Sequence, residues 1–244
     1  MYVIIIKANY MEGIIMKYEI IIFDADDTLF DFKKSERDAF KNAMLEFDIE
    51  YDENHHLKIY QGINTAIWKE FEEGLITQEK LKVERFKRLS DSLNAGFDEV
   101  EFAKSYMKHL ANASFLYDDS IDLVESLHKD YRLTIVTNGL KDVQDKRIRK
   151  SIIAKYFEDV VVSEEVKVSK PDPKIFEHAL NNIKHTDKSK VLIVGDSLTS
   201  DIQGGINSGI DTCWFNSNKI VNKTKIKPTY EISNLIELKD ILEK

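Results

Sequence analysis

The stretch IIIFDADDTLF, residues 20–30, decides how the rest of the chain is interpreted. Its apolar start, Ile20–Phe23, is typical of a buried strand, and a cluster of carboxylates follows directly. Asp24 and Asp26 lie two residues apart, so both side chains point to the same side if the backbone stays extended. Crowded carboxylates repel each other, and a hard divalent cation with oxygen ligands commonly relieves that repulsion. Taken alone, the stretch also fits a polar loop after a strand.

The composition is that of a chain with room for one large domain or a main domain with a smaller second unit. The chain has 244 residues, of which 43% are hydrophobic, enough to build a core. Its net charge of −8 argues against a nucleic-acid polymer as partner. An anionic small molecule stays possible, because a metal ion and a lysine can reverse the local charge.

Two further features concern the compartment in which the protein works. Cys213 is the only cysteine, so no internal disulfide can form, and a reducing cytoplasm is the expected location. No apolar run approaches the length of a membrane span, so no membrane partner is expected. The chain could be a monomer or a homodimer. We also expect residues 1–15 to be a dispensable N-terminal extension, with Met16 as the functional start, which mass spectrometry of the native protein would test.

Residues 33–113 show helical patterns and no strand pattern. Phe40, Met44 and Phe47 repeat at spacings of four and three, which places them on one face of a helix. Three more such patterns follow, separated by Gly74 and by the capping residues Thr77 and Asp98. The sequence therefore predicts a small four-helix unit inserted after the first strand.

From residue 116 onward, strand and helix patterns alternate. Strands are predicted over 133–137, 160–163, 191–194, 212–215 and 230–232, and helices over 120–129, 141–155, 174–182, 201–208 and 235–242. Continuous β-branched runs between helices indicate a parallel sheet that is covered on both faces. We therefore expect an α/β core, a doubly wound, Rossmann-like sheet built from residues 16–32 and 114–244. Ligands of such sheets bind at the carboxyl ends of the strands.

Polar side chains follow these strands where a ligand site is expected. The residues are Asp24, Asp26 and Thr28 after the first strand, Thr137 and Asn138 after the second, Asp196 and Asp201 after the fourth, and Lys170 between them. Three of the carboxylates can together hold one Mg²⁺. The hydroxyl and amide groups can hydrogen-bond phosphate oxygens, and the lysine can balance their charge.

These motifs resemble, in order and spacing, the four motifs of the haloacid dehalogenase-like phosphatase superfamily. They are Asp24–Thr28, Thr137–Gly139, Lys170–Pro171, and Gly195–Ser197 with Asp201. The resemblance spans residues 18–243. It implies a phosphomonoester hydrolase that depends on Mg²⁺ and has a mobile helical cap, here residues 33–113. A turn of that cap, residues 72–76, would dip toward the active site and help to choose the substrate.

The resemblance also implies a role for each motif residue. Asp24 would attack phosphorus and form an aspartyl-phosphate, and Asp26 would protonate the leaving alcohol and then deprotonate the hydrolytic water. The metal ligands would be Asp24, the backbone carbonyl of Asp26, and Asp196, with Asp201 holding the water ligands of the metal. Phosphate would be bound by Thr137, Asn138 and Lys170. The neighbouring Asp27 is expected to face away from the site, because Asp26 faces in.

Within the superfamily, the chain most resembles bacterial house-cleaning 5′-nucleotidases that act on pyrimidine monophosphates. The stretches that carry this likeness include Phe32, Asn64 with Trp68, Gly74 with Ile76–Thr77, Arg85–Phe86, Ser163–Val166, Lys170–Phe176, Gly204–Asn207, and Thr212–Trp214 with Asn216. The likeness implies substrates such as UMP, dUMP and dTMP. The candidate substrate-binding residues are Phe32, Asn64, Trp68, Phe71 and Gly74, although for Trp68 and Phe71 we favour packing in the cap core.

Two other interpretations stay open from the sequence. A sugar-phosphate or phosphoglycolate phosphatase, or a phosphomutase, would carry the same four motifs, because specificity is determined in the cap. A phospho-accepting signalling receiver uses similar residues, but it is about half this length and has no helical insert.

Overall fold

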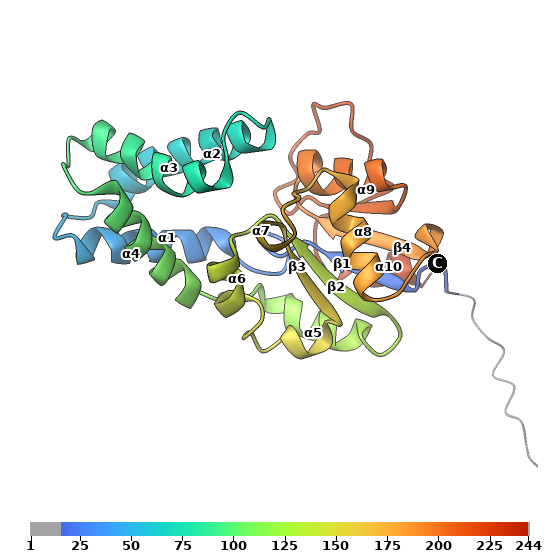
Figure 1. The fold of residues 1–244 in the computed structure, drawn as a ribbon. Helices are drawn as coiled ribbons and strands as arrows, with labels where there is room; N and C mark the ends of the chain where they lie inside the picture. Colours follow the sequence, from blue (N-terminus) through green and yellow to red (C-terminus); the bar gives the residue numbers. More distant parts are fainter. Residues whose placement is uncertain (1–15, 244) are drawn as a thin grey trace, which may run out of the picture.

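Six parallel strands form the centre of the computed structural model, which describes residues 16–243 (Figure 1). The extension predicted for residues 1–15 lies outside the described residues. The strands are β1 (Ile20–Phe23), β2 (Arg132–Thr137), β3 (Asp159–Val162), β4 (Val191–Gly195), β5 (Asp211–Phe215) and β6 (Tyr230–Ile232). Their order is β3-β2-β1-β4-β5-β6, which confirms the doubly wound sheet. The chain changes direction across the sheet at β1 and β4, the position at which such folds bind ligands.

Helices cover both faces of the sheet, as its β-branched strands require. Ile21 and Phe23 belong to the hydrophobic cluster under α5 (Asp118–Leu127) and α10 (Glu237–Leu242). Ile20 and Ile22 belong to the opposite cluster, with α8 (Pro173–Asn182). This alternation follows from the two-residue period of a strand. Because β1 is buried on both faces, the residues that follow it have a fixed starting position.

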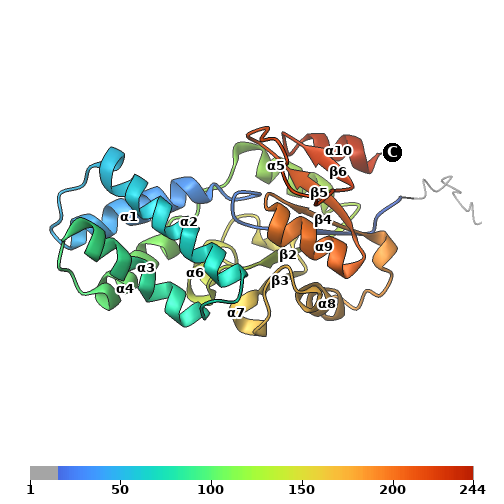
Figure 2. The same cartoon turned by 90° about the horizontal axis from the view of Figure 1, so that it is seen from above.

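Four helices between β1 and α5 lie together at one end of the molecule (Figure 2). They are α1 (Phe32–Glu46), α2 (Lys58–Glu72), α3 (Gln78–Leu93) and α4 (Glu99–Asn112), with a π-helical turn, Glu53–Leu57, before α2. Their apolar faces, including Phe40, Tyr60, Phe86 and Phe102, form a separate cluster that also takes in two side chains from the start of α6. We infer from this separate cluster that residues 33–113 form a cap on a core of residues 16–32 and 114–244.

Two short connections join the cap to the core, and they lie side by side. Phe30 and Leu116 form an antiparallel bridge, and the Asp31 amide donates a hydrogen bond of 3.0 Å to the Phe115 carbonyl. Asp31 also caps α1 through its side chain. The entry to the cap and the exit from it are therefore fixed against each other.

The helix predicted over 141–155 is shorter in the structure. It ends as α6 (Lys141–Arg147), and a 3₁₀-helix, Ala154–Tyr156, follows after turns. The Ser151 amide and hydroxyl both donate to the Ile148 carbonyl, at 3.0 and 2.7 Å. Serine side chains compete with helical hydrogen bonds in this way, which explains the early end.

Several other elements begin or end a few residues from the expected boundaries. Residue 163 begins α7 (Ser163–Val166) instead of ending a strand, and a π-helical turn, Leu198–Ile202, precedes α9 (Gln203–Ser208). A 3₁₀-helix, Lys188–Lys190, leads into β4. None of the helices within residues 16–243 is long and apolar enough to cross a membrane.

The start of α4 provides a test of the cap's local stability. Asp98 accepts hydrogen bonds from the amides of Val100 and Glu101, both at 2.9 Å. Replacing Asp98→Ala leaves these amides without a partner and should lower the free energy of unfolding by about 0.5–2 kcal/mol. Urea unfolding measures the change. Asp98→Asn, which keeps the accepting oxygen, is the matched control, and an equal loss in both variants would contradict the capping role.

Candidate active site

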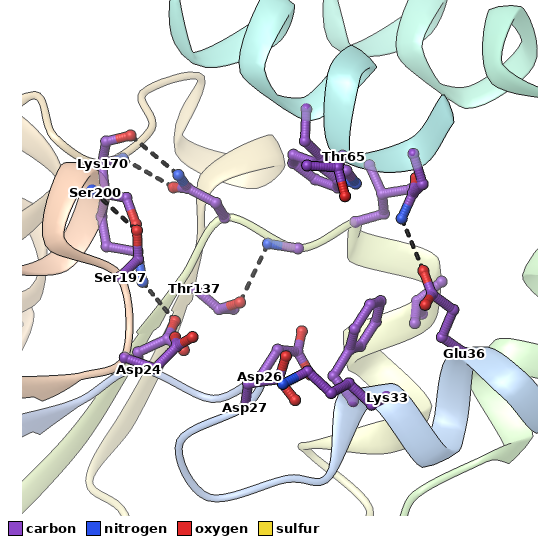
Figure 3. Close-up of a pocket in the computed structure, with 18 of the residues that line it drawn as sticks. Asp24, Asp26, Asp27, Lys33, Glu36, Thr65, Thr137, Lys170, Ser197 and Ser200 are labelled. Carbon is purple, nitrogen blue, oxygen red and sulfur yellow. Dashed lines mark hydrogen bonds and ion pairs between the residues drawn. The ribbon is translucent and has the colours of Figure 1, made fainter. Parts of the chain in front are cut away.

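A cavity of about 750 Å³ lies between the carboxyl ends of the strands and the cap (Figure 3). Pockets for small ligands commonly have volumes of about 300–1,000 Å³. The core lines it with Asp24, Asp26, Phe32, Thr137, Asn138, Lys170, Asp196, Ser197 and Asp201, and the cap lines it with Glu36, Asn64, Thr65, Trp68, Glu72 and Arg85, among others. The structure therefore brings the predicted motif residues together in one place.

A buried lysine holds two of the carboxylates together. The Lys170 ammonium lies 2.5 Å from Asp24 Oδ1 and 2.6 Å from Asp201 Oδ1, and it donates to the Val136 carbonyl at 2.8 Å. Its side chain is only 2% exposed. The second oxygen of Asp201 accepts a 2.9 Å hydrogen bond from the Ser197 amide. Asp24 Oδ2 is reached by the Thr28 hydroxyl at 3.4 Å.

The charges of this group shift the proton affinities of its members. Burial raises the pKa of Asp24 to about 7, with Lys170 opposing the rise and Asp201 and Asp26 adding to it. Burial, with the nearby Asp201 and Asp24, also raises the pKa of Asp196 well above its usual range. Burial disfavours the charged form of Lys170, but Asp201 and Asp24 outweigh that effect and raise its pKa. One lysine is thus surrounded by an excess of negative charge.

The same excess of negative charge suits the binding of a metal ion. Asp24, Asp196 and Asp201 each offer a carboxylate oxygen, and these oxygens lie within 4.8 Å of one another. Such a donor set, all hard oxygen, is the one that Mg²⁺ prefers. Asp201 uses one oxygen for Lys170 and the other for the Ser197 amide, and its role in holding the metal's water ligands stays a prediction. The side chain of Asp26 lies outside this group, and its backbone carbonyl stays the predicted ligand.

Thr137 and Asn138 lie at the end of β2 beside these carboxylates, and both line the cavity. The Thr137 hydroxyl accepts from the Gly139 amide at 3.1 Å. The Asn138 side chain makes two hydrogen bonds to the backbone of Lys170, with the Lys170 carbonyl at 3.0 Å and its amide at 2.8 Å. The side-chain amide of Asn138 therefore positions the Lys170 loop, and a phosphate contact of Asn138 stays a prediction.

Asp26 is held by two residues that we did not single out from the sequence. Arg147 donates to Asp26 Oδ1 and Gln144 to Oδ2, both at 2.7 Å. Arg147 is completely buried and also donates to the Ala113 carbonyl at 3.0 Å. The sequence gives only a weak indication of this role, because a glutamine and an arginine lie one turn apart on the helix that follows the Thr137 motif.

The sequence led us to expect that Asp27 faces away from the site, and the structure shows that this prediction was wrong. Asp27 lines the cavity next to Asp26, and the Tyr117 hydroxyl donates to its Oδ1 at 3.4 Å. Its φ of 59° is in the left-handed region, so the two-residue alternation of extended backbone ends here. Burial raises the pKa of Asp27, while nearby Lys33 opposes the rise.

Three of the five candidate substrate-binding residues line the cavity, namely Phe32, Asn64 and Trp68. Phe71 does not, because its ring packs edge-on against the Trp68 ring, with centroids 5.7 Å apart. Gly74 is exposed and outside the lining, and its φ of 71° serves the turn after α2. At the start of that turn, however, Glu72 lines the cavity and accepts a hydrogen bond from the Thr199 hydroxyl of the core at 3.3 Å.

Comparison with known proteins agrees with this geometry. Residues 21–215 match the family model of the haloacid dehalogenase-like hydrolases. The chain therefore belongs to this family of hydrolases, as its motifs led us to expect.

Among similar characterised proteins are two pyrimidine 5′-nucleotidases. PynA of Streptococcus pneumoniae is 36% identical over 94% of this chain and 97% of its own length. YjjG of Escherichia coli is 33% identical over 93% and 99%, respectively. A solved structure of the HAD-hydrolase YfnB from Bacillus subtilis, bound to magnesium, superposes with a TM-score of 0.88 at 36% identity, covering 93% of this chain and 99% of that one.

Gly195, at the end of β4, provides a test of how tightly the site is packed. A Cβ atom on Gly195 would lie 2.3 Å from Asp201 Oδ2. The Asp201 carboxylate is held in place by Lys170 through Oδ1 and by the Ser197 amide through Oδ2. Gly195→Ala should therefore lower the free energy of unfolding by about 1–3 kcal/mol, as other overpacked positions do. Denaturant unfolding measures it.

Gly62 is the matched control for this test. It lies exposed in α2, and beyond the local backbone of its own helix no atom lies within 4 Å of the position that an alanine methyl group would take. Gly62→Ala should raise the stability by up to about 1 kcal/mol, because alanine restricts the unfolded chain and favours a helix. A Gly195→Ala protein as stable as the parent would show that Asp201 is not confined as described.

Proposed function

We propose that the protein is a Mg²⁺-dependent 5′-nucleotidase that hydrolyses pyrimidine nucleoside monophosphates such as UMP, dUMP and dTMP. The observation that supports it most is that one continuous cavity has two different ends (Figure 3). Asp24, Lys170 and Ser197 lie at one end, and the cap residues Glu36 and Thr65 lie at the other. A substrate with a phosphate at one end and a polar ring at the other matches this division.

The core end suits phosphoryl transfer, which depends mainly on positioning and on charge stabilisation. In the proposed reaction an Asp24 oxygen forms a bond to phosphorus as the 5′-oxygen of the nucleoside leaves, and Asp26 protonates that oxygen. Asp26 then takes a proton from water, the water oxygen bonds to phosphorus, and inorganic phosphate leaves as the Asp24 carboxylate is restored. Lys170 and Thr137 stabilise the phosphoryl oxygens in both steps.

Mg²⁺, when bound, would neutralise the charge that builds up on the phosphoryl group. Asp24 and Asp196 would hold it with the Asp26 carbonyl, and Asp201 would hold its water ligands. Without the cation, the phosphate would approach three close carboxylates with only one lysine to offset them. The chain's own residues therefore support a metal requirement.

The cap end suits a nucleobase better than a sugar alone. Trp68 and Phe32 supply flat apolar rings, and the Arg147 guanidinium lies 5.3 Å from the centroid of the Phe32 ring. Asn64 adds a side-chain amide. Planar rings with one or two fixed polar groups are the usual components of a base site. The kinship with PynA and YjjG points to the same class of substrate.

A small phosphate ester is thus the proposed partner, and the proposed location is the cytoplasm. The buried free thiol of Cys213, with no disulfide in the chain, supports a reducing compartment. The number of subunits is left as monomer or homodimer.

Phosphate release across a panel of esters tests the proposal directly. With Mg²⁺ present, UMP, dUMP and dTMP should be hydrolysed with a higher kcat/KM than purine nucleotides, hexose phosphates and phosphoglycolate. Excess EDTA should abolish the activity, and added Mg²⁺ should restore it. A preference for a hexose phosphate or for phosphoglycolate would overturn the nucleotidase assignment and leave the catalytic residues as proposed. Asp24→Asn protein, prepared in parallel, controls for contaminating phosphatases.

A pair of aromatic residues tests the base site. Trp68 lines the cavity and Phe71 does not, although they pack together on the same helix. Trp68→Ala should raise KM for UMP by about tenfold, since stacking on a base contributes about 1–3 kcal/mol. Phe71→Ala, the matched control, should have a smaller effect on KM. Steady-state kinetics measure both, and equal effects would indicate that the two rings serve only the cap core.

A further inference from the structure

Three polar side chains from three different cap helices meet at the end of the cavity away from Asp24. They are Glu36 of α1, Asn64 of α2 and Arg85 of α3, and all three are at least 94% buried and line the cavity. Asn64 Nδ2 donates to Glu36 Oε1 at 2.8 Å, and Arg85 donates to Asn64 Oδ1 at 3.1 Å. The Asn64 amide thus lies between a carboxylate and a guanidinium.

This arrangement fixes which way the amide of Asn64 faces. A carboxylate only accepts hydrogen bonds and a guanidinium only donates them. Turning the amide over would place its NH₂ against Arg85 and its oxygen against Glu36, and both hydrogen bonds would be lost. Gln61 further holds Glu36, donating to its second oxygen at 3.3 Å. The orientation of Asn64 is therefore set by its two charged neighbours.

The fixed amide still has hydrogen-bonding capacity. Its NH₂ group has two hydrogens and its oxygen has two lone pairs, and Glu36 and Arg85 use one of each. One N–H and one lone pair of the amide stay available. Trp68 follows Asn64 by four residues on α2, so the ring and the amide share one face of the helix. A base whose face contacts the ring of Trp68 can therefore bring its edge to the amide.

The charge at this end also limits the ligand. Glu36 and Arg85 carry opposite charges, and the amide between them is neutral. Within residues 16–243, no carboxylate lies within 4.0 Å of the Arg85 guanidinium, whose Nε also has no hydrogen-bond partner. A neutral ring edge suits the amide between Glu36 and Arg85, because that amide carries no charge.

We propose that Asn64, held by Glu36 and Arg85, determines specificity by reading the C=O and N–H groups that lie side by side on uracil and thymine. This inference rests on the proposed function and names the part of the base that the cap recognises. The amide N–H donates to the ring carbonyl, and the amide oxygen accepts from N3–H. Both edges of uracil around N3 present this pair, so the choice of edge does not matter.

Cytosine does not match the fixed amide in either pose of uracil. Its N3 has no hydrogen and its position 4 carries an NH₂ group, so one or both contacts become acceptor against acceptor or donor against donor. Cytosine could pair through N3 and its NH₂ group only after a shift by one ring position, and the phosphate held at the core end opposes that shift. A bidentate contact of this kind discriminates between bases by about 1–3 kcal/mol, roughly 5- to 150-fold in kcat/KM. Guanine presents the same adjacent C=O and N–H groups as uracil. The amide therefore selects bases by the hydrogen-bonding groups on their edge and not by the size of the ring system.

Substrate analogues test the inference without altering the protein. We expect kcat/KM to be about tenfold or more higher for UMP than for CMP. 3-Methyl-UMP, which has no N3–H, should be as poor a substrate as CMP or poorer. Equal values for UMP and 3-methyl-UMP would overturn the proposal. If the protein does not favour pyrimidine monophosphates at all, the proposed function fails and this inference fails with it.

Variants separate the reading of the base from support of the cap. Asn64→Ala should bring the UMP/CMP ratio of kcat/KM close to one, and Glu36→Gln, which removes the charge that orients the amide, should lower it in the same direction. Hydrolysis of p-nitrophenyl phosphate, which has no base, should fall less than hydrolysis of UMP in both variants. A UMP/CMP ratio unchanged in both, with UMP still preferred over hexose phosphates, would overturn the inference but not the proposed function.

The matched control is Glu70→Gln. Glu70 of α2 forms an ion pair with Arg88 of α3 at 2.6 Å, so it joins the same two helices as Asn64 and Arg85, but it does not line the cavity. This variant should leave the UMP/CMP ratio unchanged. If it lowered the ratio as much as Glu36→Gln does, the cluster would act only through cap stability. Should Asn64→Ala lose its activity on p-nitrophenyl phosphate through misfolding, Glu36→Gln and the analogues decide the question.

Discussion

The site depends on one buried interaction, the contact of the Lys170 ammonium with Asp24 and Asp201. A buried lysine without partners would lose its proton, and buried carboxylates without a cation would gain one. Together each reduces the cost of burying the other, although burial still raises the pKa of Asp24 to about 7. The parallel sheet supplies this geometry, since β1 and β4 are neighbours and their carboxyl ends place Asp24 beside Asp196 and Asp201. The strand order and the charge pairing are thus two parts of the same constraint.

One lysine does not neutralise three carboxylates, and this imbalance connects the fold to its chemistry. An arrangement chosen for stability alone would place apolar groups at these buried positions. The residual negative charge instead makes the site a place for a divalent cation, and the cation and Lys170 together can receive a phosphate dianion. Gly195 is part of this arrangement, because any larger residue there would push Asp201 from its position between Lys170 and the Ser197 amide.

Much of this could be predicted from the sequence, and the exceptions have physical reasons. Apolar strands followed by acids, a hydroxyl and a lysine predict the sheet and its site, because parallel strands bring their carboxyl ends to one edge. Asp27 was misplaced because a left-handed φ is not visible in an alternating pattern. Helix periodicity put Trp68 and Phe71 on one face without showing that only Trp68 reaches the cavity. Arg147 and Arg85 were missed as functional residues because their roles come from contacts between elements far apart in the chain.

Arg147 shows how the cap and the chemistry are joined. Its guanidinium donates to Asp26 Oδ1 at 2.7 Å, to the Ala113 carbonyl at 3.0 Å and to the Ser35 hydroxyl at 3.4 Å. Ala113 lies where the chain leaves the cap, and Ser35 lies in the first turn of α1, where it enters. One core side chain therefore contacts both ends of the cap and the carboxylate of Asp26. Because these groups share a single planar guanidinium, the cap connections cannot shift against the core without straining the hydrogen bond that positions Asp26. The position of the cap and that of the Asp26 carboxylate are thus not independent in this fold.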